Sequence, residues 1–348
     1  MQKKTMICSV FCIIFIVGMV APVFAAPSVD LIQVGTSLAK PDSPPGLTKP
    51  PKPGKNAGAS VDIRNIASGE TLMGTVLIIA EVEGEFDSVE FEASGVSKTM
   101  EQVGTTNRYQ TSWTAGAVGG ETLTVNAKTG ENVVSSDSVT VNVVDTYQAV
   151  LFFEIDYLAG HEPTDDVINY IRGYWNSRAI DVTLKLDDAV ADPTLDGVIS
   201  DSDFWNLELN YNDAEIVDDR AGGVLNNGKF TLMEKWMLCG SFASSSSLGG
   251  STWVLNDGSA GNYIFIADSM IDNWETEYGI PDDGGEVTVL CHEMGHSIGI
   301  LVTRGPKEKY DPDRYSVMST MTLENSKYMA GYWYYSKEYW QTANLEYY

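Results

Sequence analysis

The segment EVTVLCHEMGHSIG, Glu286 to Gly299, carries the most informative pattern of the chain. Its apolar residues recur at helical spacing, which predicts a helix over Glu286 to Ile298. His292 and His296 stand four positions apart, so they lie on one face of that helix, about one turn apart. The chain has three histidines, and two of them fall here. The pattern predicts that both imidazoles meet one metal ion.

Glu293 directly follows the first of these histidines. Zinc takes nitrogen ligands in tetrahedral geometry and keeps one position open for water at a catalytic site. The carboxylate of Glu293 can take a proton from a zinc-activated water and later give it to a leaving amine. On this interpretation His292 and His296 are zinc ligands and Glu293 is the general base of peptide hydrolysis. The alternative is a buried helix whose two histidines are satisfied inside the protein.

HEMGHSIG matches the pattern H-E-x-x-H-x-x-G of the metzincin clan of zinc peptidases, in which the glycine ends the helix. YSVMS, Tyr315 to Ser319, is similar to the metzincin Met-turn, which would place Met318 beneath the metal. The chain thus resembles the matrixin-like and serralysin-like branches, as a divergent prokaryotic subfamily. Serralysin-like enzymes have a tyrosine where this chain has Thr320. The resemblance implies a metzincin-like zinc peptidase domain over residues 147–348.

The third metal ligand departs from the family pattern. Val302 stands where the family has His or Asp, and its side chain cannot bind zinc. The segment that follows, Thr303 to Arg314, offers oxygen atoms at Glu308, Tyr310, Asp311 and Asp313. Asp311 stands seven residues before Met318, close to the interval of compact matrixin-like sites. Asp311 is therefore the preferred third ligand, and Asp313 is the second candidate.

An α/β pattern begins near residue 147. Ala149 to Ile155 predicts a buried strand, Thr164 to Arg178 a helix, and Ala179 to Leu186 a second strand. Two further strands are expected at Trp253 to Leu255 and Tyr263 to Ala267. In the family that the chain resembles, an edge strand precedes one more strand and then the zinc helix.

That order assigns the substrate edge strand to Trp253, Val254 and Leu255. An extended protein or peptide substrate would add to this edge through main-chain hydrogen bonds.

Residues 59–146 show short alternating runs divided by Gly, Ser and Asn, which favours an all-β sandwich. The expected strands are Thr71 to Glu83, Ser88 to Ala93, Tyr109 to Thr114, Glu121 to Lys128 and Ser138 to Val144. The stretch resembles immunoglobulin-like modules of exported prokaryotic proteins, although it lacks the cysteine pair of antibody domains. The fold class is therefore multidomain, with an immunoglobulin-like sandwich followed by an α/β (α+β) metzincin-like domain.

The N-terminus has the layout of a secretory signal peptide. Lys3 and Lys4 precede an apolar run from Met6 to Val20, and cleavage is expected after Ala25. An uncleaved anchor is the alternative, although the run is short for a helix that needs about 20 residues to cross a bilayer. Residues 26–58, rich in Pro, Gly and Lys, predict an extended linker. The expected location is secreted, extracellular or at the cell surface, without a transmembrane segment in the processed chain.

The formal net charge of −26 argues against a nucleic-acid partner. Such acidity is compatible with bound calcium. The weak candidate for a calcium site is an acidic run with carboxylates at Asp192, Asp196, Asp201 and Asp203. An acidic surface loop is the alternative interpretation of that run.

Smaller features complete the pattern. Cys239 and Cys291 can form a disulfide or remain free, buried thiols. His161 is expected to be a solvent-exposed loop residue, and the aromatic C-terminal tail is expected to pack into the core.

Three functions follow from these features. The leading hypothesis is a secreted zinc endopeptidase. The second is a catalytically weak or inactive cell-surface binding or adhesion protein that uses the β-sandwich, with a cell-surface partner, and a metzincin-like scaffold. The third is a purely structural metal site, which is usually closed by four protein ligands. The presence of Glu293 favours the first hypothesis, because a structural site needs no general base.

Overall fold

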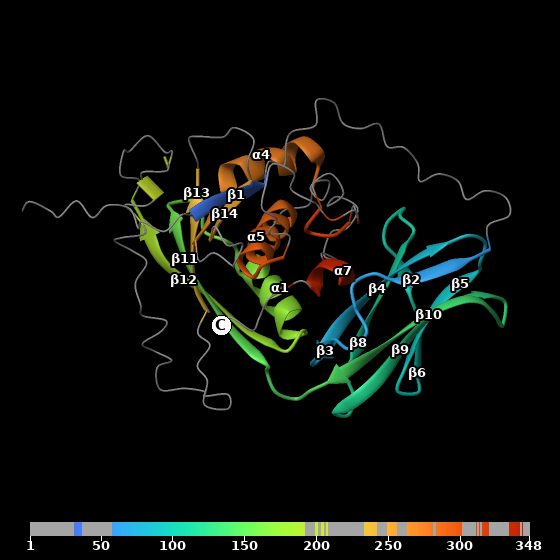
Figure 1. Cartoon of the computed structure of the whole chain (residues 1–348). Helices are drawn as coiled ribbons and strands as arrows, with labels where there is room; N and C mark the ends of the chain where they lie inside the picture. Colours follow the sequence, from blue (N-terminus) through green and yellow to red (C-terminus); the bar gives the residue numbers. More distant parts are fainter. Residues whose placement is uncertain are drawn as a thin grey trace, which may run out of the picture.

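The computed structural model describes residues 31–36, 58–191, 199–200, 203–204, 207, 233–241, 249–255, 263–280, 283–300, 311, 313, 315–319, 334–341 and 343. For residues 31–36 the description covers the backbone alone. Figure 1 shows two units rich in β-structure, a sandwich and a mixed sheet packed against helices. The β-rich, multidomain organisation expected from the sequence is therefore confirmed.

Two sheets form the sandwich, in the orders β3-β10-β9-β5-β6 and β2-β4-β8-β7. The strands are β2 Ser60–Ile63, β3 Thr71–Leu72, β4 Thr75–Glu83, β5 Ser88–Ala93, β6 Val96–Thr99, β7 Glu101–Gln102, β8 Arg108–Thr114, β9 Gly119–Thr129 and β10 Asn132–Val143. Burial alternates along them, as at Val139, Val141 and Val143 of β10. These valines share one cluster with Phe91 of β5 in the same sheet and Ile78 of β4 in the facing sheet. The period-two pattern thus buries one face of each sheet.

The second unit is built on a six-stranded sheet of order β1-β14-β15-β13-β11-β12. Its strands are β1 Leu31–Thr36, β11 Ala149–Leu158, β12 Ile180–Val190, β13 Met233–Gly240, β14 Gly250–Leu255 and β15 Tyr263–Ala267. Strands β12, β11, β13 and β15 run parallel to one another, whereas β14 is antiparallel to β15 and β1 is antiparallel to β14. The near-continuous apolar run of β11 is buried on both faces, as parallel strands usually are.

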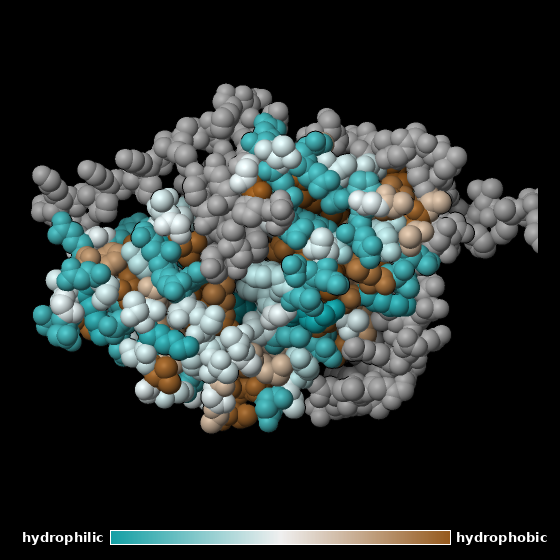
Figure 2. Space-filling model, turned by 180° about the vertical axis from the view of Figure 1, so that it is seen from behind, coloured by the Kyte–Doolittle hydropathy of each residue, from teal (hydrophilic) through white to brown (hydrophobic). Residues whose placement is uncertain are grey.

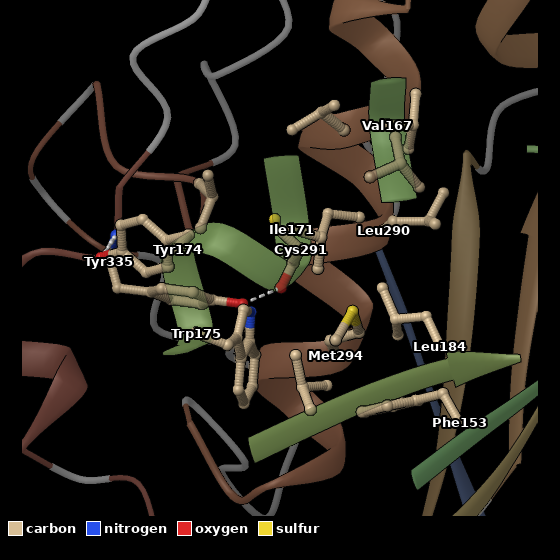
Figure 3. Packing of buried hydrophobic residues seen from close by; sticks show 14 of the residues in the cluster. Phe153, Val167, Ile171, Tyr174, Trp175, Leu184, Leu290, Cys291, Met294 and Tyr335 are labelled. Carbon is tan, nitrogen blue, oxygen red and sulfur yellow. Dashed lines mark hydrogen bonds between the residues drawn. The ribbon is translucent and has the colours of Figure 1, made fainter. Parts of the chain in front are cut away.

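Within the described residues, the helices that accompany this sheet are α1 Asp165–Asn176, α4 Asp268–Tyr278, α5 Gly284–Ser297 and α7 Lys337–Trp340. The Thr164 hydroxyl accepts a hydrogen bond from the Val167 N–H and caps the start of α1. Figure 3 shows the packed core between α1, α5 and the sheet, with Trp175 of α1 and Met294 of α5 among the labelled side chains. This core fixes α5 in the centre of the unit.

The expected packing of the aromatic tail is confirmed where the structure describes it. Tyr334, Tyr335 and Trp340 are buried, and the rings of Tyr335 and Trp340 lie 5.3 Å apart. Trp175 stacks edge-on against both. The C-terminal segment is thus part of the core that supports α5.

Two strands of the second sheet were not expected from the sequence. Strand β13 occupies the sheet centre although its sequence, MEKWMLCG, contains Glu234 and the fully buried Lys235 before the apolar run. Burial lowers the pKa of Lys235 to about 7. Strand β1 falls within residues 26–58, which the sequence predicts as linker, so that part of the linker prediction is wrong.

Strand β1 also shows that the predicted position of the sheet edge is wrong. Trp253 to Leu255 form the end of β14, which begins at Gly250. Strand β14 is not the outermost strand, because β1 pairs with it from Leu31 opposite Leu255 to Thr36 opposite Gly250. Strand β1 therefore covers the edge that was assigned to a substrate.

The two units share buried contacts. Ile79 and Val103 of the sandwich belong to the same hydrophobic cluster as α1 and α5. Arg178, which follows α1, is buried and places its Nε 3.1 Å from a Glu70 carboxylate oxygen. Its Nη2 donates to the main-chain oxygen of Asn65 over 2.8 Å. The sandwich therefore packs against the helical side of the second unit, near α7 (Figure 1).

The side chains of Cys239 and Cys291 are free and buried, so for this pair the thiol alternative holds over the disulfide. Burial raises the pKa of Cys291 to about 12, which makes its thiol a poor nucleophile. Of the acidic run, Asp203 is described, and its carboxylate accepts the N–H of Ser200 over 3.0 Å. Asp192, Asp196 and Asp201 lie outside the described residues.

Figure 2 shows hydrophilic residues over most of one face, with apolar residues scattered among them. Among the described residues, the exposed large apolar side chains are Val96, Val118, Val133 and Val134, all in the sandwich. No helix within the described ranges has both the length and the apolar character of a membrane span.

Candidate metal centre

Helix α5 carries the predicted histidine pair and is buried along its whole length. It ends where the sequence predicts, because Gly299 adopts a left-handed conformation with φ of 87°. The N–H groups of Gly299 and Ile300 donate to the carbonyls of His296 and Gly295, each over 3.0 Å. The chain therefore turns sharply away from the helix just after His296.

The two imidazoles are adjacent, and each uses its Nδ1 atom to bond a main-chain carbonyl oxygen. Their ring centroids lie 4.6 Å apart. His292 Nδ1 contacts the carbonyl oxygen of Val317 over 2.6 Å, and His296 Nδ1 contacts that of Ile300 over 3.0 Å. Because a carbonyl can only accept, both Nδ1 atoms carry the proton. Each Nε2 is left with a lone pair, the form in which histidine binds a metal.

His292 Nε2 is buried and has no hydrogen-bond partner among the described residues. Burial, and next the neighbouring His296, holds the pKa of His292 well below its ordinary value. Burial also lowers the pKa of His296 to about 4. Both rings are therefore neutral at physiological pH, and the His292 ring presents an unsatisfied acceptor in the protein interior.

Glu293 is fully buried beside strand β14. The Thr252 hydroxyl lies 2.6 Å from Glu293 Oε2 and 3.1 Å from the main-chain oxygen of the same residue. A side chain at Gly250 would place its Cβ 2.7 Å from Glu293 Cγ, so glycine is required there. Strand β14 thus contacts Glu293 through Thr252 and Gly250, a residue pair that the sequence did not single out. The predicted strand began one residue after Thr252.

The predicted Met-turn lies against the same helix. Met318 is fully buried, and a Cβ at Gly295 would lie 2.8 Å from its sulfur. The Val317 N–H donates a hydrogen bond to the carbonyl of Tyr334, and the Val317 carbonyl accepts one from His292 Nδ1. Helix α5 and the turn at Tyr315–Ser319 are therefore in direct contact at the glycine between the two histidines.

Tyr335 supports the helix from the same side. Its hydroxyl donates to the Cys291 carbonyl (Figure 3), and its ring would also meet a Cβ at Gly295. Neither contact was predicted, because aromatic residues in the tail gave no sign of which helix they would meet.

Asp311 lies beside the turn, since its N–H donates to the Met318 carbonyl over 3.3 Å. Its carboxylate accepts the Ser336 hydroxyl and, over 2.8 Å, the N–H of Asp313. The Asp313 carboxylate is instead surrounded by Arg64, Arg108 and Tyr334. Over the described ranges, no three His, Cys, Asp or Glu side chains come together as a metal-binding group. Residues 301–310, with Glu308 and Tyr310, lie outside those ranges.

The sequence predicts His161 as a solvent-exposed loop residue; it does lie in a loop, but the expected exposure is wrong. It is half-buried, and its Nδ1 lies 2.8 Å from Asp268 Oδ2 at the start of α4. The hydrogen bond to Asp268 raises the pKa of His161. The residue therefore belongs to an ion pair at the helix start, away from the histidine pair in sequence.

Comparison with known proteins gives little beyond local likeness. No protein-family model matches the chain, and no curated protein matches it. A solved endo-β-1,4-mannanase from Thermotoga petrophila is similar at 16% identity over 26% of this chain and 20% of that one, with a TM-score of 0.24. Fibronectin(III)-like modules of CbhA from Clostridium thermocellum are similar at 25% identity over 24% of this chain and 93% of theirs, with a TM-score of 0.20.

The chitinase ChiW of a Paenibacillus strain shares 15% identity over 56% of this chain and 17% of that one, with a TM-score of 0.20. This chain thus spans about a fifth of the mannanase and less of the chitinase. At these TM-scores the likenesses assign neither a fold nor a function.

Proposed function

We propose that the chain is an exported zinc-dependent endopeptidase of metzincin-like design, with His292 and His296 as metal ligands and Glu293 as general base. One observation carries the proposal. His292 Nε2 is buried without a hydrogen-bond partner in the described part of the chain, while Nδ1 of the same ring is fixed by the Val317 carbonyl. A buried acceptor of this kind is costly unless something binds it.

The donor set suits zinc. Two neutral imidazoles on one helical face, each with Nδ1 bonded to a carbonyl, are the nitrogen ligands that zinc prefers. Zinc held there would act as a Lewis acid that activates water and polarises a peptide carbonyl. The same preference supports zinc over calcium, which favours six to eight oxygen ligands.

Glu293 supplies the proton transfers in this proposal. Its carboxylate belongs to the residue that directly follows His292 and stands three before His296. It would take a proton from the attacking water and deliver it to the departing amine nitrogen. Thr252 supports this role, because its hydroxyl donates to Oε2 and restrains the carboxylate. The full burial of Glu293 strengthens its interaction with nearby charge, since little water competes.

Asp311 remains the proposed third ligand. The support is positional, because its main chain is hydrogen bonded to Met318, whose sulfur lies against α5 between the two histidines. To reach the metal, its carboxylate would exchange the Ser336 hydroxyl for zinc. Ser336 therefore offers a direct way to examine this assignment.

The test is metal content together with hydrolysis. Purified protein is analysed for zinc and then incubated with an unstructured protein, with and without a chelator. We expect about one zinc per chain and cleavage that the chelator abolishes and added zinc restores. The double variant His292→Ala with His296→Ala should lose both.

Two results would redirect the proposal. Unchanged zinc content in the double histidine variant would show that the metal binds elsewhere. A wild-type protein that holds zinc and cleaves no substrate would favour the alternative of a cell-surface binding protein.

A further inference from the structure

The Asp313 carboxylate is a buried junction between the two units. Its side chain has no exposed surface. It accepts hydrogen bonds from Arg108 Nη2 over 2.8 Å, Arg64 Nε over 3.0 Å and the Tyr334 hydroxyl over 2.9 Å. The two arginines come from the sandwich, whereas the aspartate and tyrosine come from the C-terminal part of the second unit.

The sandwich holds these arginines firmly. Arg108 opens β8 and is itself almost fully buried, with its guanidinium paired to Glu81 of β4 and 5.1 Å from the Tyr315 ring centroid. Arg64 follows β2 and also contacts Asp62 over 2.6 Å. Each guanidinium therefore bridges a carboxylate of the sandwich and Asp313, a geometry that arginine's fixed fork of donors suits.

Asp313 is joined to the histidine pair by a short path. The Ser316 N–H donates to the Asp313 carbonyl over 2.9 Å, and the Tyr315 N–H donates to its carboxylate over 3.2 Å. These bonds close the turn that leads into Val317. The Val317 carbonyl accepts the hydrogen bond from His292 Nδ1. Moving Asp313 would therefore displace the carbonyl that orients the His292 ring.

A spacer or adhesion module would have no need for this junction. Burying the charges of Asp313 and Arg108, with Arg64 half-buried beside them, carries a desolvation penalty that their mutual attraction and hydrogen bonds must offset. Removing one partner leaves the others charged and buried, so the turn would have to rearrange. The junction thus makes the turn beneath α5 dependent on the sandwich.

We propose that Arg64 and Arg108 of the sandwich are positioning residues for the histidine pair, acting through Asp313 and the turn from Tyr315 to Ser319. This inference rests on the proposed zinc site, and it gives the sandwich a part in building that site.

The experiment compares full-length variants with a matched control. Arg108→Ala and the milder Arg64→Gln remove contacts to Asp313, and the less buried Arg64 covers the case in which Arg108→Ala does not fold. Lys128→Ala is the control, because it breaks the Lys128–Glu90 ion pair elsewhere in the sandwich. Zinc dissociation constants are measured by chelator competition. We expect a rise of about tenfold or more for the arginine variants and no change for the control.

A second readout does not depend on metal. In metal-free protein, the proton on His292 Nδ1 is followed by NMR, and amide exchange is compared between Tyr315–Ser319 and helix α1. The arginine variants should lose or shift the Nδ1 proton signal and exchange faster in the turn, while α1 is unaffected. Arg108→Lys should restore part of the effect, because it keeps the charge and loses the fork.

The outcomes separate the two proposals. Folded arginine variants with wild-type zinc affinity and an unchanged His292 signal would overturn the positioning role. Equal acceleration of exchange in the turn and in α1 would also overturn it, because that result indicates general destabilisation. If the wild-type chain takes up no zinc, the proposed function fails, and the metal-free readout still decides the role of the arginines.

Discussion

The Nδ1 atom of His292 lies 2.6 Å from the main-chain carbonyl oxygen of Val317, the residue before Met318. The contact joins two segments that the sequence keeps apart, the HEMGH helix and the turn at Tyr315–Ser319. It fixes which ring nitrogen is protonated, and so it leaves Nε2 of His292 available for a metal. The geometry of the site depends on how closely these two segments pack.

Substitution of Gly295 tests how closely the helix and the turn pack. A Cβ at this position would lie 2.8 Å from Met318 Sδ and from Tyr335 Cε1, both buried. Gly295→Ala should therefore lower the free energy of unfolding by about 1–3 kcal/mol, despite the better helix propensity of alanine. Gly173→Ala in α1 is the matched control, because a Cβ there meets nothing within 4 Å. It should stabilise by about 0.5–1 kcal/mol in urea unfolding. Equal effects of both substitutions would contradict the close approach of Met318.

If the proposed function holds, Glu293→Gln should keep the metal and lose hydrolysis. Glutamine fits the same space but cannot take a proton, so turnover should fall by about 10²–10⁴-fold with zinc content unchanged. Thr252→Val removes the hydroxyl donor to Oε2 and should cost less, on the order of tenfold. Steady-state rates on an unstructured protein, together with metal analysis, measure both. An active Glu293→Gln protein would rule out the general-base role.

Asp311 and Ser336 form a pair that identifies the third ligand. If the Asp311 carboxylate binds zinc, Asp311→Ala should weaken zinc affinity by about tenfold or more. Ser336→Ala should then leave affinity unchanged or tighten it, because it releases the carboxylate from its hydroxyl partner. Chelator competition measures both constants. Parallel losses in the two variants would show that the hydrogen bond is structural and that the ligand is another residue.

Strand β1 should reduce access to the proposed site. It pairs with β14 opposite Thr252 and Gly250, the residues that contact Glu293. A chain beginning at residue 58 exposes this edge, so its kcat/KM on an extended substrate should be several-fold higher. Added peptide LIQVGT should inhibit the shortened chain, and a scrambled peptide of the same composition should not. Unchanged kcat/KM would show that substrates bind elsewhere.

His161 gives a pH-dependent contribution to stability. The hydrogen bond to Asp268 raises its pKa in the folded state, with a further contribution from the charge of Asp272. A raised pKa stabilises the fold below the unfolded value of about 6.5, and the stabilisation is lost as pH rises through the folded value. His161→Gln should therefore lower the unfolding free energy by up to about 1 kcal/mol near pH 5 and by much less near pH 9. A pH-independent difference would contradict the ion pair.

The sequence predicts α5 and its histidines well because the relevant signal is local. Helical periodicity sets the helix, and Gly299 marks its end. The strands of the sandwich are similarly local, and β5 matches the expected Ser88 to Ala93. Such patterns depend on residues a few positions apart, so neighbouring sequence is enough to find them.

Long-range contacts explain what the sequence did not predict. Strand β13 was not predicted, because the buried Lys235 breaks the apolar pattern expected of a central strand. Asp313 was considered as a metal ligand, yet its partners Arg64 and Arg108 lie in a different unit of the chain. A carboxylate's role depends on which cations the fold brings to it, and spacing along the chain does not contain that information.

The pairing of Leu31 with Leu255 also bears on how the protein is made. Strand β1 is synthesised long before its partner, and closing so large a loop is slow. Until β14 exists, LIQVGT is an uncharged segment without proline and with two β-branched aliphatic residues, the composition of aggregation-prone strands. Asp30 and the prolines on both sides of the segment LIQVGT act against intermolecular β-pairing. We therefore expect the proline-rich stretch to protect the nascent chain from aggregation.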